Sequence, residues 1–383
     1  MKQKLKAILA LSLGLAVLPA AAQVKIGATI PLTGPAAMLG LGQQKAMQMY
    51  GDKAGDLSLQ YITLDDASDT TVAVVNAKKL ATEHKVDVII GSSTTPQCLA
   101  MLDTVSQAKV PTICLGSASA VVAPMDDMRK WVFKIPPNDE VWIEGMLQHM
   151  QQTGIKRLGF IGFNDAFGEA WLKGTTKLAP KYGIELVATE RYNRGDSSIV
   201  AQVLKLQMQK PDAVIVAASG TPGALPTLTL RERGYKGKIY LNASVATKEF
   251  MITAGSSADG ALLSVGVGLV AEEVPDSNPL KQLNLEFKKA YEDKFGQGSF
   301  NIFAMQGYDA FRILQKAVPE AAKHAKPGTP EYRAALRDAI ESIRDLYGNT
   351  GIYSFSAQDH SGLDTRAVVI AEIQNGVMKY VPQ

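Results

Sequence analysis

Small hydroxyl residues and glycines follow several short apolar runs that are typical of buried strands. These residues are Thr33, Gly34, Ser92 to Thr95, Ser117, Ser119, Ser219 to Thr221, Asn242 and Ser244. Hydroxyl groups and free backbone N–H groups at a helix N-terminus suit a carboxylate or another oxyanion. The same side chains also suit helix caps and turns, and the two roles are compatible. Their recurrence at several strand ends favours a site that binds an anion without Arg or Lys.

Motifs for catalysis do not occur in the sequence. Gly40 and Gly42 have Lys45 where a dinucleotide-binding fingerprint needs a third glycine, and neither a phosphate-binding loop nor a nucleophile elbow is found. Four isolated histidines lack metal-ligand spacing, namely His84, His149, His324 and His360. The pair Asp65 and Asp66 precedes a helix, where capping and loop hydrogen bonds explain it better than acid–base catalysis. The sequence therefore predicts no enzyme, no catalytic residue, no metal and no cofactor.

Strand and helix patterns alternate along the chain, which is typical of parallel sheets covered by helices on both faces. The predicted strands are 24–30, 57–64, 86–90, 110–114, 157–161, 184–190, 213–217, 238–242, 351–355 and 367–373. The alternation occurs twice, so we predict an α/β fold with two doubly wound lobes. Asn375 and Gly376 have the chemistry of a hairpin turn.

The first 22 residues have the pattern of an export signal. Three lysines precede an apolar run at 7–18, and Ala20 and Ala22 fit cleavage just before Gln23. The run is too short to span a bilayer, and no later segment is long and apolar enough. A retained anchor or a buried helix is the alternative. We therefore expect a periplasmic protein with no membrane span in the mature chain.

Removal of this signal leaves a chain with no net formal charge. The full sequence has 40 Lys and Arg against 37 Asp and Glu, and the three signal lysines account for the excess. This balance gives no electrostatic reason to expect nucleic acid or an anionic membrane as a partner. About 360 mature residues predict two domains. The two cysteines, Cys98 and Cys114, are either paired or two buried thiols.

Several short motifs follow one another in a characteristic order. They are Ile26-Gly27, Pro31-Leu32-Thr33-Gly34, Asp65-Asp66, Gly91 to Thr95, Val110 to Ile113, Asn164 to Gly168, and Tyr308-Asp309-Ala310. In this order the mature chain resembles the periplasmic binding proteins of the branched-chain amino acid type, which serve ABC transporters. The resemblance implies two Rossmann-like lobes joined by three hinge strands, with a ligand cleft between them. Lobe one would comprise 23–138 with 268–346, and lobe two 139–267 with 347–383.

The resemblance also implies partners and binding residues. The partners would be a small carboxylate ligand and the permease subunits of a transporter, and we expect a monomer. In the family a hydroxyl residue four places after the glycine that ends the third strand binds the ligand carboxylate, and here this is Thr95. The next loop would supply Ser117 and Ser119, and two aromatic positions fall on Phe167 and Phe303. The full predicted set is Met38, Leu39, Ser93, Thr94, Thr95, Ser117, Ser119, Phe167, Thr221, Asn242 and Phe303.

Two positions depart from the amino acid binders of this family. An aromatic residue usually follows the Thr-Gly loop, but here that position is Leu39 beside Met38. A carboxylate usually follows the strand equivalent to 238–242 and pairs with the ligand ammonium, but the next acid here is Glu249. Because an unpaired ammonium in a dry cleft is costly, we hypothesise an aromatic or apolar organic acid, or a 2-oxo acid, without an α-amino group. Asp165 could still supply the missing charge.

Other functions remain open at this point. A branched-chain or other amino acid is the alternative ligand. A ligand-sensing receptor module, which contacts a signalling partner rather than a permease, is the alternative role. A hydrolase or a nucleotide-dependent enzyme on the same kind of fold is disfavoured by the missing motifs.

Overall fold

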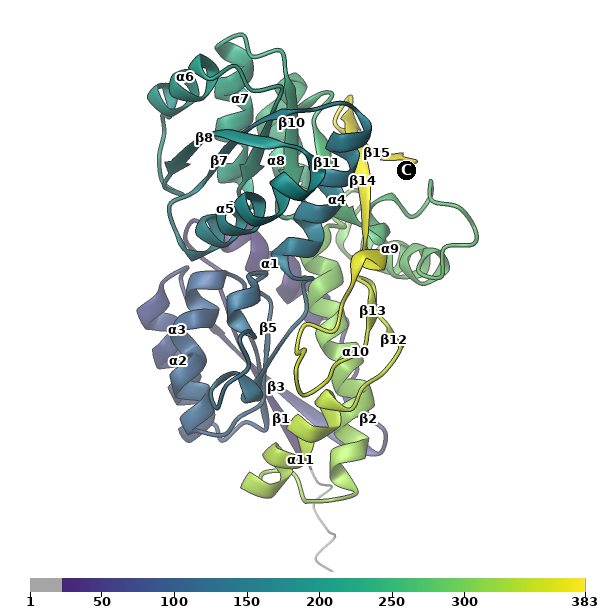
Figure 1. Cartoon of the computed structure of the whole chain (residues 1–383). Helices are drawn as coiled ribbons and strands as arrows, with labels where there is room; N and C mark the ends of the chain where they lie inside the picture. The colour runs from purple at the N-terminus through teal and green to yellow at the C-terminus, as the bar shows by residue number, and fades with distance from the viewer. Residues whose placement is uncertain (1–22, 383) are drawn as a thin grey trace, which may run out of the picture.

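The computed structural model describes residues 23–382, which form two α/β lobes, one above the other in Figure 1. Each lobe is built on one mainly parallel sheet with helices on both faces, so the predicted fold class is confirmed. The predicted export signal lies outside the described residues. No helix of residues 23–382 has the length and hydrophobicity needed to cross a membrane.

The first lobe has a six-stranded sheet in the order β2-β3-β1-β4-β5-β6. Its strands are β1 Gln23–Ile30, β2 Lys53–Ala54, β3 Leu57–Asp65, β4 Val88–Gly91, β5 Thr112–Cys114 and β6 Val132–Lys134. Its helices are α1 Ala37–Met47, α2 Thr70–Thr82, α3 Thr95–Gln107, α10 Ile302–Ala322 and α11 Pro330–Glu341. The helices form one layer on each face of the sheet, because successive side chains of a strand point to opposite faces. In β4, Val88 and Ile90 pack in the core with α10 and α11, whereas Ile89 packs in the core with α2 and α3.

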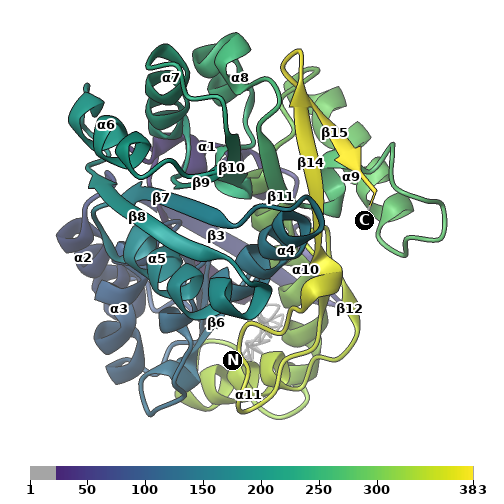
Figure 2. The same ribbon diagram turned by 45° about the horizontal axis from the view of Figure 1, so that its top comes forward.

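The second lobe has a seven-stranded sheet in the order β15-β14-β11-β10-β9-β7-β8. Its parallel strands are β7 Arg157–Phe163, β8 Glu185–Tyr192, β9 Ala213–Ala217, β10 Lys238–Asn242 and β11 Leu262–Gly266, and its antiparallel strands are β14 Val368–Gln374 and β15 Val377–Val381. The helices are α4 Asp139–Gln152, α5 Ala166–Leu178, α6 Val200–Met208, α7 Ala224–Glu232 and α8 Lys248–Ala254. Figure 2 shows α4 and α5 on one face of the sheet and α6 to α8 on the other. Asn375 and Gly376 both have positive φ and join β14 to β15, which confirms the predicted hairpin turn.

The chain crosses between the lobes three times. The crossings lie between β6 and α4, between β11 and α10, and between β13 (Ile352–Tyr353) and β14. β13 pairs with β12, Leu346–Tyr347, and α9, Lys281–Phe295, lies in the second crossing. Tyr353, Phe355 and Leu363 pack in the core of the first lobe. The exact lobe boundaries stay a prediction.

The two lobes touch across the cleft. Ala36 and Leu39, at the start of α1, are buried in the core of the second lobe. A Cβ placed at Gly220 would lie 3.4 Å from Leu39 Cδ1, so α1 and the turn after β9 approach closely. The structure therefore represents a closed arrangement of the lobes.

The two cysteines do not form a disulfide. Both are buried and free, and their thiols donate to the carbonyl oxygens of Ser92 and Gly91. Of the two alternatives that the sequence allowed, the structure therefore has two buried thiols.

Asp309, from the Tyr-Asp-Ala motif, anchors the segment that precedes the third crossing. Its buried carboxylate accepts hydrogen bonds from the backbone N–H groups of Asn349 and Thr350, both at 2.6 Å, and from Tyr353 Oη at 3.1 Å. Burial raises the pKa of Asp309, and these donors oppose the rise. One side chain of α10 thus satisfies a buried turn far away in the sequence.

Replacing Asp309 with alanine should lower the free energy of unfolding by about 3 kcal/mol or more, because several buried donors lose their acceptor. Urea denaturation of the chain from Gln23 onwards measures this loss. Asp338→Ala, at an exposed position of α11, is the control and should change stability by less than about 0.5 kcal/mol. Equal effects of the two substitutions would contradict the anchoring role.

Candidate functional site

A small cavity of about 20 Å³ lies where the two lobes meet. It is lined by Leu39, Ser93, Thr94, Thr95, Leu115, Ser117, Pro136, Phe167, Arg194, Ser219, Ser244, Phe303 and Gln306. A volume of this size holds about one water molecule. A ligand can therefore enter only when the lobes open, as expected for hinge closure around a binding site.

The N-terminus of α3 is open towards this cavity. Thr94 occupies the cap position, but its side chain makes no cap hydrogen bond. Its Oγ1 atom is buried and has no hydrogen-bond partner in the described part of the chain. Thr95 Oγ1 accepts a hydrogen bond from the N–H of Ala118 at 3.4 Å, which leaves its own proton available. The partial positive charge of the helix end and two free hydroxyl protons therefore meet at one place, which suits an anion.

Ser93 and the acidic pair support the loop that presents this helix end. The Ser93 hydroxyl donates to Gln43 Oε1 of α1, which is fully buried. Ser92 Oγ donates to Asp66 Oδ2 at 2.6 Å, and burial raises the pKa of Asp66 to about 6. Asp65 accepts from the N–H of Leu32 at 2.8 Å. The acidic pair thus serves loop hydrogen bonding, as expected from its position.

Arg194 contributes a cation from the second lobe. Its Nε donates to Asp165 Oδ2 and its Nη1 to Ser219 Oγ, both at 2.8 Å. The guanidinium lies 4.0 Å from the centre of the Phe163 ring. Arg194 thus lines the cavity, which the sequence did not predict, but it is paired with Asp165, and binding of the anion without Arg or Lys stays a prediction. The position of Arg194 just after β8 was the available signal, because neighbouring parallel strands end at the same edge of a sheet.

The carboxylate of Asp165 already has hydrogen-bond and ion-pair partners within the second lobe. Its carboxylate caps α5 by accepting from the N–H groups of Phe167 and Gly168, and it pairs with Arg194. It is absent from the cavity lining. Asp165 thus has a cationic partner already, which argues against its pairing with a ligand ammonium.

The structure brings seven of the eleven predicted site residues to the cavity. They are Leu39, Ser93, Thr94, Thr95, Ser117, Phe167 and Phe303. Leu115, Pro136, Arg194 and Gln306 also line it and were not predicted, whereas Ser219 and Ser244, which line it too, are among the hydroxyl residues noted at strand ends in the sequence. That these side chains bind a ligand remains a prediction.

Four predicted residues lie outside the cavity lining, each for a local reason. Met38 lines a neighbouring surface groove, one residue along α1 from Leu39. Ser119 donates to Glu140 Oε1 at 3.4 Å, and Thr221 begins a short 3-10 helix, Thr221–Gly223. Asn242 caps the next 3-10 helix by accepting from the N–H of Ser244 at 2.8 Å. Asn242 thereby positions Ser244, which does line the cavity.

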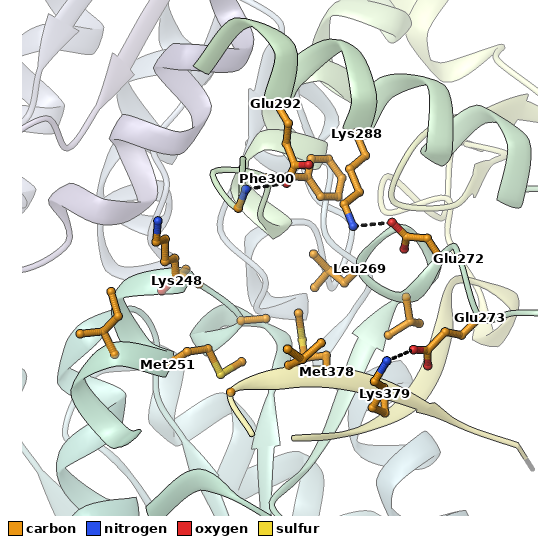
Figure 3. A pocket seen from close by; sticks show the side chains of 17 residues that line it. Lys248, Met251, Leu269, Glu272, Glu273, Lys288, Glu292, Phe300, Met378 and Lys379 are labelled. Carbon is orange, nitrogen blue, oxygen red and sulfur yellow. Dashed lines mark hydrogen bonds and ion pairs between the residues drawn. The ribbon is translucent and has the colours of Figure 1, made fainter. Parts of the chain in front are cut away.

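A larger groove of about 640 Å³ lies elsewhere, between α8, α9 and β15 (Figure 3). The ion pairs Lys288–Glu272, at 2.5 Å, and Lys379–Glu273, at 2.6 Å, lie at its wall. Met251, Leu269, Phe300 and Met378 supply an apolar surface. Two of its lysines are thus paired with glutamates, whereas Lys248, which also lines the groove, has no ion pair in the described part of the chain.

Comparisons with known proteins agree on one family. The family model described as "Periplasmic binding protein" matches residues 23–377. A solved extracellular ligand-binding receptor from Rhodopseudomonas palustris HaA2 is 42% identical, with a TM-score of 0.90, over 94% of this chain and 100% of that chain. The Leu/Ile/Val-binding protein homolog 7 of Brucella abortus is 20% identical over 94% of this chain and 91% of its own length.

A third relative was solved with a ligand. It is an ABC transporter solute-binding protein from R. palustris in complex with benzoate, which is 21% identical with a TM-score of 0.80, over 94% of this chain and 95% of that chain. At this identity the likeness shows the shared fold alone.

Arg194→Met should lower the free energy of unfolding of the ligand-free protein by about 1–2 kcal/mol, because the partly buried Asp165 loses its partner. Arg191→Met is the matched control, since Arg191 and Glu169 form a more exposed pair of the same lobe, with 41% and 48% of their side chains exposed against 18% and 21% for Arg194 and Asp165. The control should cost less than about 0.5 kcal/mol. Thermal denaturation at neutral pH compares them, and a larger loss for the control would contradict this reading.

Proposed function

The chain belongs to the periplasmic binding protein family, and on that premise we propose that it delivers a small organic acid to the permease of an ABC transporter. The proposed ligand is an aromatic or apolar carboxylate without an α-amino group. Family members are solute-binding proteins of the periplasm or cell exterior and are not enzymes. The resemblance read from the short sequence motifs is confirmed by the family match.

The observation that carries the ligand proposal is the charge pattern of the cavity lining. The open N-terminus of α3, with Thr94 and Thr95, offers hydrogen bonds to a carboxylate. The described residues that line the cavity include no Asp or Glu. An α-ammonium group enclosed there would lose its water without gaining an anionic partner, which is strongly unfavourable. An acid without an amino group meets no such penalty.

The remaining lining suits an apolar body with a polar far end. Leu39, Leu115, Phe167 and Phe303 offer aliphatic and aromatic surface. Arg194, Ser219 and Ser244 come from the second lobe, whereas α3 belongs to the first. A ligand that touches both walls would stabilise the closed arrangement, because it gains contacts only when the lobes meet.

The relatives bear on both ligand classes. Benzoate, bound by the R. palustris protein, is an acid of the proposed class. The names of the Brucella relatives keep a branched-chain amino acid as the alternative ligand.

The proposal is tested with leucine and with 4-methyl-2-oxopentanoate, which differs from leucine only at the α-carbon, and with two aromatic acids. We expect 4-methyl-2-oxopentanoate, benzoate or 3-phenylpropanoate to raise the melting temperature of the exported chain, and leucine to leave it unchanged. A ligand at a hundred times its dissociation constant adds about 2.7 kcal/mol to stability, which a thermal-shift assay detects. A shift with leucine and none with the acids would refute the ligand class while retaining the binding role.

Thr94→Val separates ligand binding from folding. Thr94 Oγ1 has no partner within the described chain, so its loss should leave the free energy of unfolding nearly unchanged. Affinity for the acid found in the screen should fall about 10-fold to 100-fold, because a hydrogen bond to a charged group contributes about 1.5–3 kcal/mol. Thr82→Val, at the exposed end of α2, should leave affinity unaltered. Calorimetric titration measures both variants, and unchanged affinity of Thr94→Val would argue against the carboxylate site.

A further inference from the structure

A buried charged pair lies directly beneath the cavity, at the first crossing between the lobes. Lys134 ends β6 and Asp139 begins α4, and they are 0% and 1% exposed. Lys134 Nζ donates to the carbonyl oxygens of Ser117, at 3.0 Å, and Pro136, at 2.6 Å. Ser117 Oγ donates to Asp139 Oδ1 at 2.9 Å. Since Ser117 and Pro136 both line the cavity, the pair is linked to the ligand space through them.

We propose that Asp139 is a positioning residue that controls the hydroxyl proton of Ser117, so that a carboxylate ligand binds together with one proton taken up by Asp139. This inference rests on the proposed function, because it requires an anionic ligand in the cavity. It deepens that function by adding a proton to the binding step.

The geometry of the hydroxyl explains the coupling. An ionised carboxylate only accepts hydrogen bonds, so it takes the proton of Ser117 and leaves Ser117 Oγ as an acceptor towards the cavity. A protonated Asp139 donates to Ser117 Oγ instead, which frees the Ser117 proton for the ligand carboxylate. Protonation also removes a negative charge close to the anion. The proton comes from solvent, and no covalent bond of the ligand changes.

The charges around the pair place this titration near neutral pH. Burial raises the pKa of Asp139 to about 7; Lys134 and Ser117 oppose the rise, and Glu140 adds to it. Burial lowers the pKa of Lys134, against the attraction of Asp139 and of more distant acids. The other titratable groups that face the pair are Glu140 of α4, Asp359 before β14, Cys98 of α3 and Cys114 of β5.

The sign of the effect follows from linkage. A bound carboxylate disfavours the charged form of Asp139 and so raises its pKa further. Affinity is therefore highest below pH 7 and falls as pH rises through the pKa of Asp139. Loss of the Lys134 proton at higher pH removes a positive charge and acts in the same direction.

Calorimetric titration of the exported chain with 3-phenylpropanoate, and separately with leucine, tests the proposal between pH 6 and pH 8.5. We expect affinity for the probe that binds to fall about tenfold over this range. Buffers of different ionisation enthalpy should reveal net proton uptake at pH 7 to 8.

Asp139→Asn should weaken both effects to the part that Lys134 contributes, because its amide donates to Ser117 Oγ at every pH as the protonated acid does. At pH 7, where Asp139 titrates in the wild type, the variant should take up fewer protons on binding than the wild type does. Glu140→Gln is the matched control, since Glu140 is the adjacent carboxylate and accepts from Ser119 instead. It should retain a pH-dependent affinity and proton uptake, with the midpoint at lower pH because Glu140 adds to the rise of the Asp139 pKa. A flat wild-type profile without proton uptake, or an Asp139→Asn profile as steep as that of the wild type, would overturn the proposal.

The ligand-free protein gives an independent readout. Because the pKa of Asp139 is raised on folding, the unfolding free energy of the wild type relative to Asp139→Asn should fall from about pH 4 to about pH 7 and then level off. If neither probe binds, this difference still tests the inference, because a difference that does not vary with pH would overturn the role of Asp139. If Asp139→Asn does not fold, proton uptake by the wild type on ligand binding tests the proposal. Uptake at pH 7 to 8 would support it, and no uptake would overturn it.

Discussion

The cleft depends on one constraint, which is that parallel strands bring the N-termini of their crossover helices to a single edge of the sheet. Each such strand needs a long connection, so the turn after it begins a helix whose first N–H groups lack partners. In the first lobe this occurs after β4, where α3 begins, and in the second lobe after β7 and β9. Because the two edges face one another, hydroxyl groups that elsewhere would cap helices are available to a ligand.

The charged side chains at the cleft interact with one another in the ligand-free protein. Arg194 is matched by Asp165, and Lys134 and Asp139 offset one another through Ser117. In the proposed function a single negative charge on the ligand would be met by a helix dipole and neutral hydroxyl groups. Charges interact strongly where water is excluded, so on this proposal the number of charges on the ligand would contribute strongly to selection.

Buried side chains form hydrogen bonds with two of the segments that connect the lobes. Asp309 holds the turn at Asn349 and Thr350 before the third crossing, and Lys134 holds the carbonyl oxygens at the first crossing. The start of α1 packs into the second lobe beside Gly220, where a Cβ would lie in ordinary van der Waals contact with Leu39 Cδ1. The first and third crossings are thus held by buried hydrogen bonds close to where they leave the first lobe.

The sequence by itself determined the alternation of strands and helices, the Asn375–Gly376 hairpin and the family, because periodicity, turn chemistry and motif order are local properties. It also located Thr95 and Phe167, which stand at fixed offsets from strand ends. Only the tertiary structure decided that Leu39 and not Met38 faces the cavity, since adjacent helical side chains point about 100° apart. It also revealed Arg194 and the link from Asp139 to Ser117, because these contacts join segments whose separation in the chain says nothing about their distance in space.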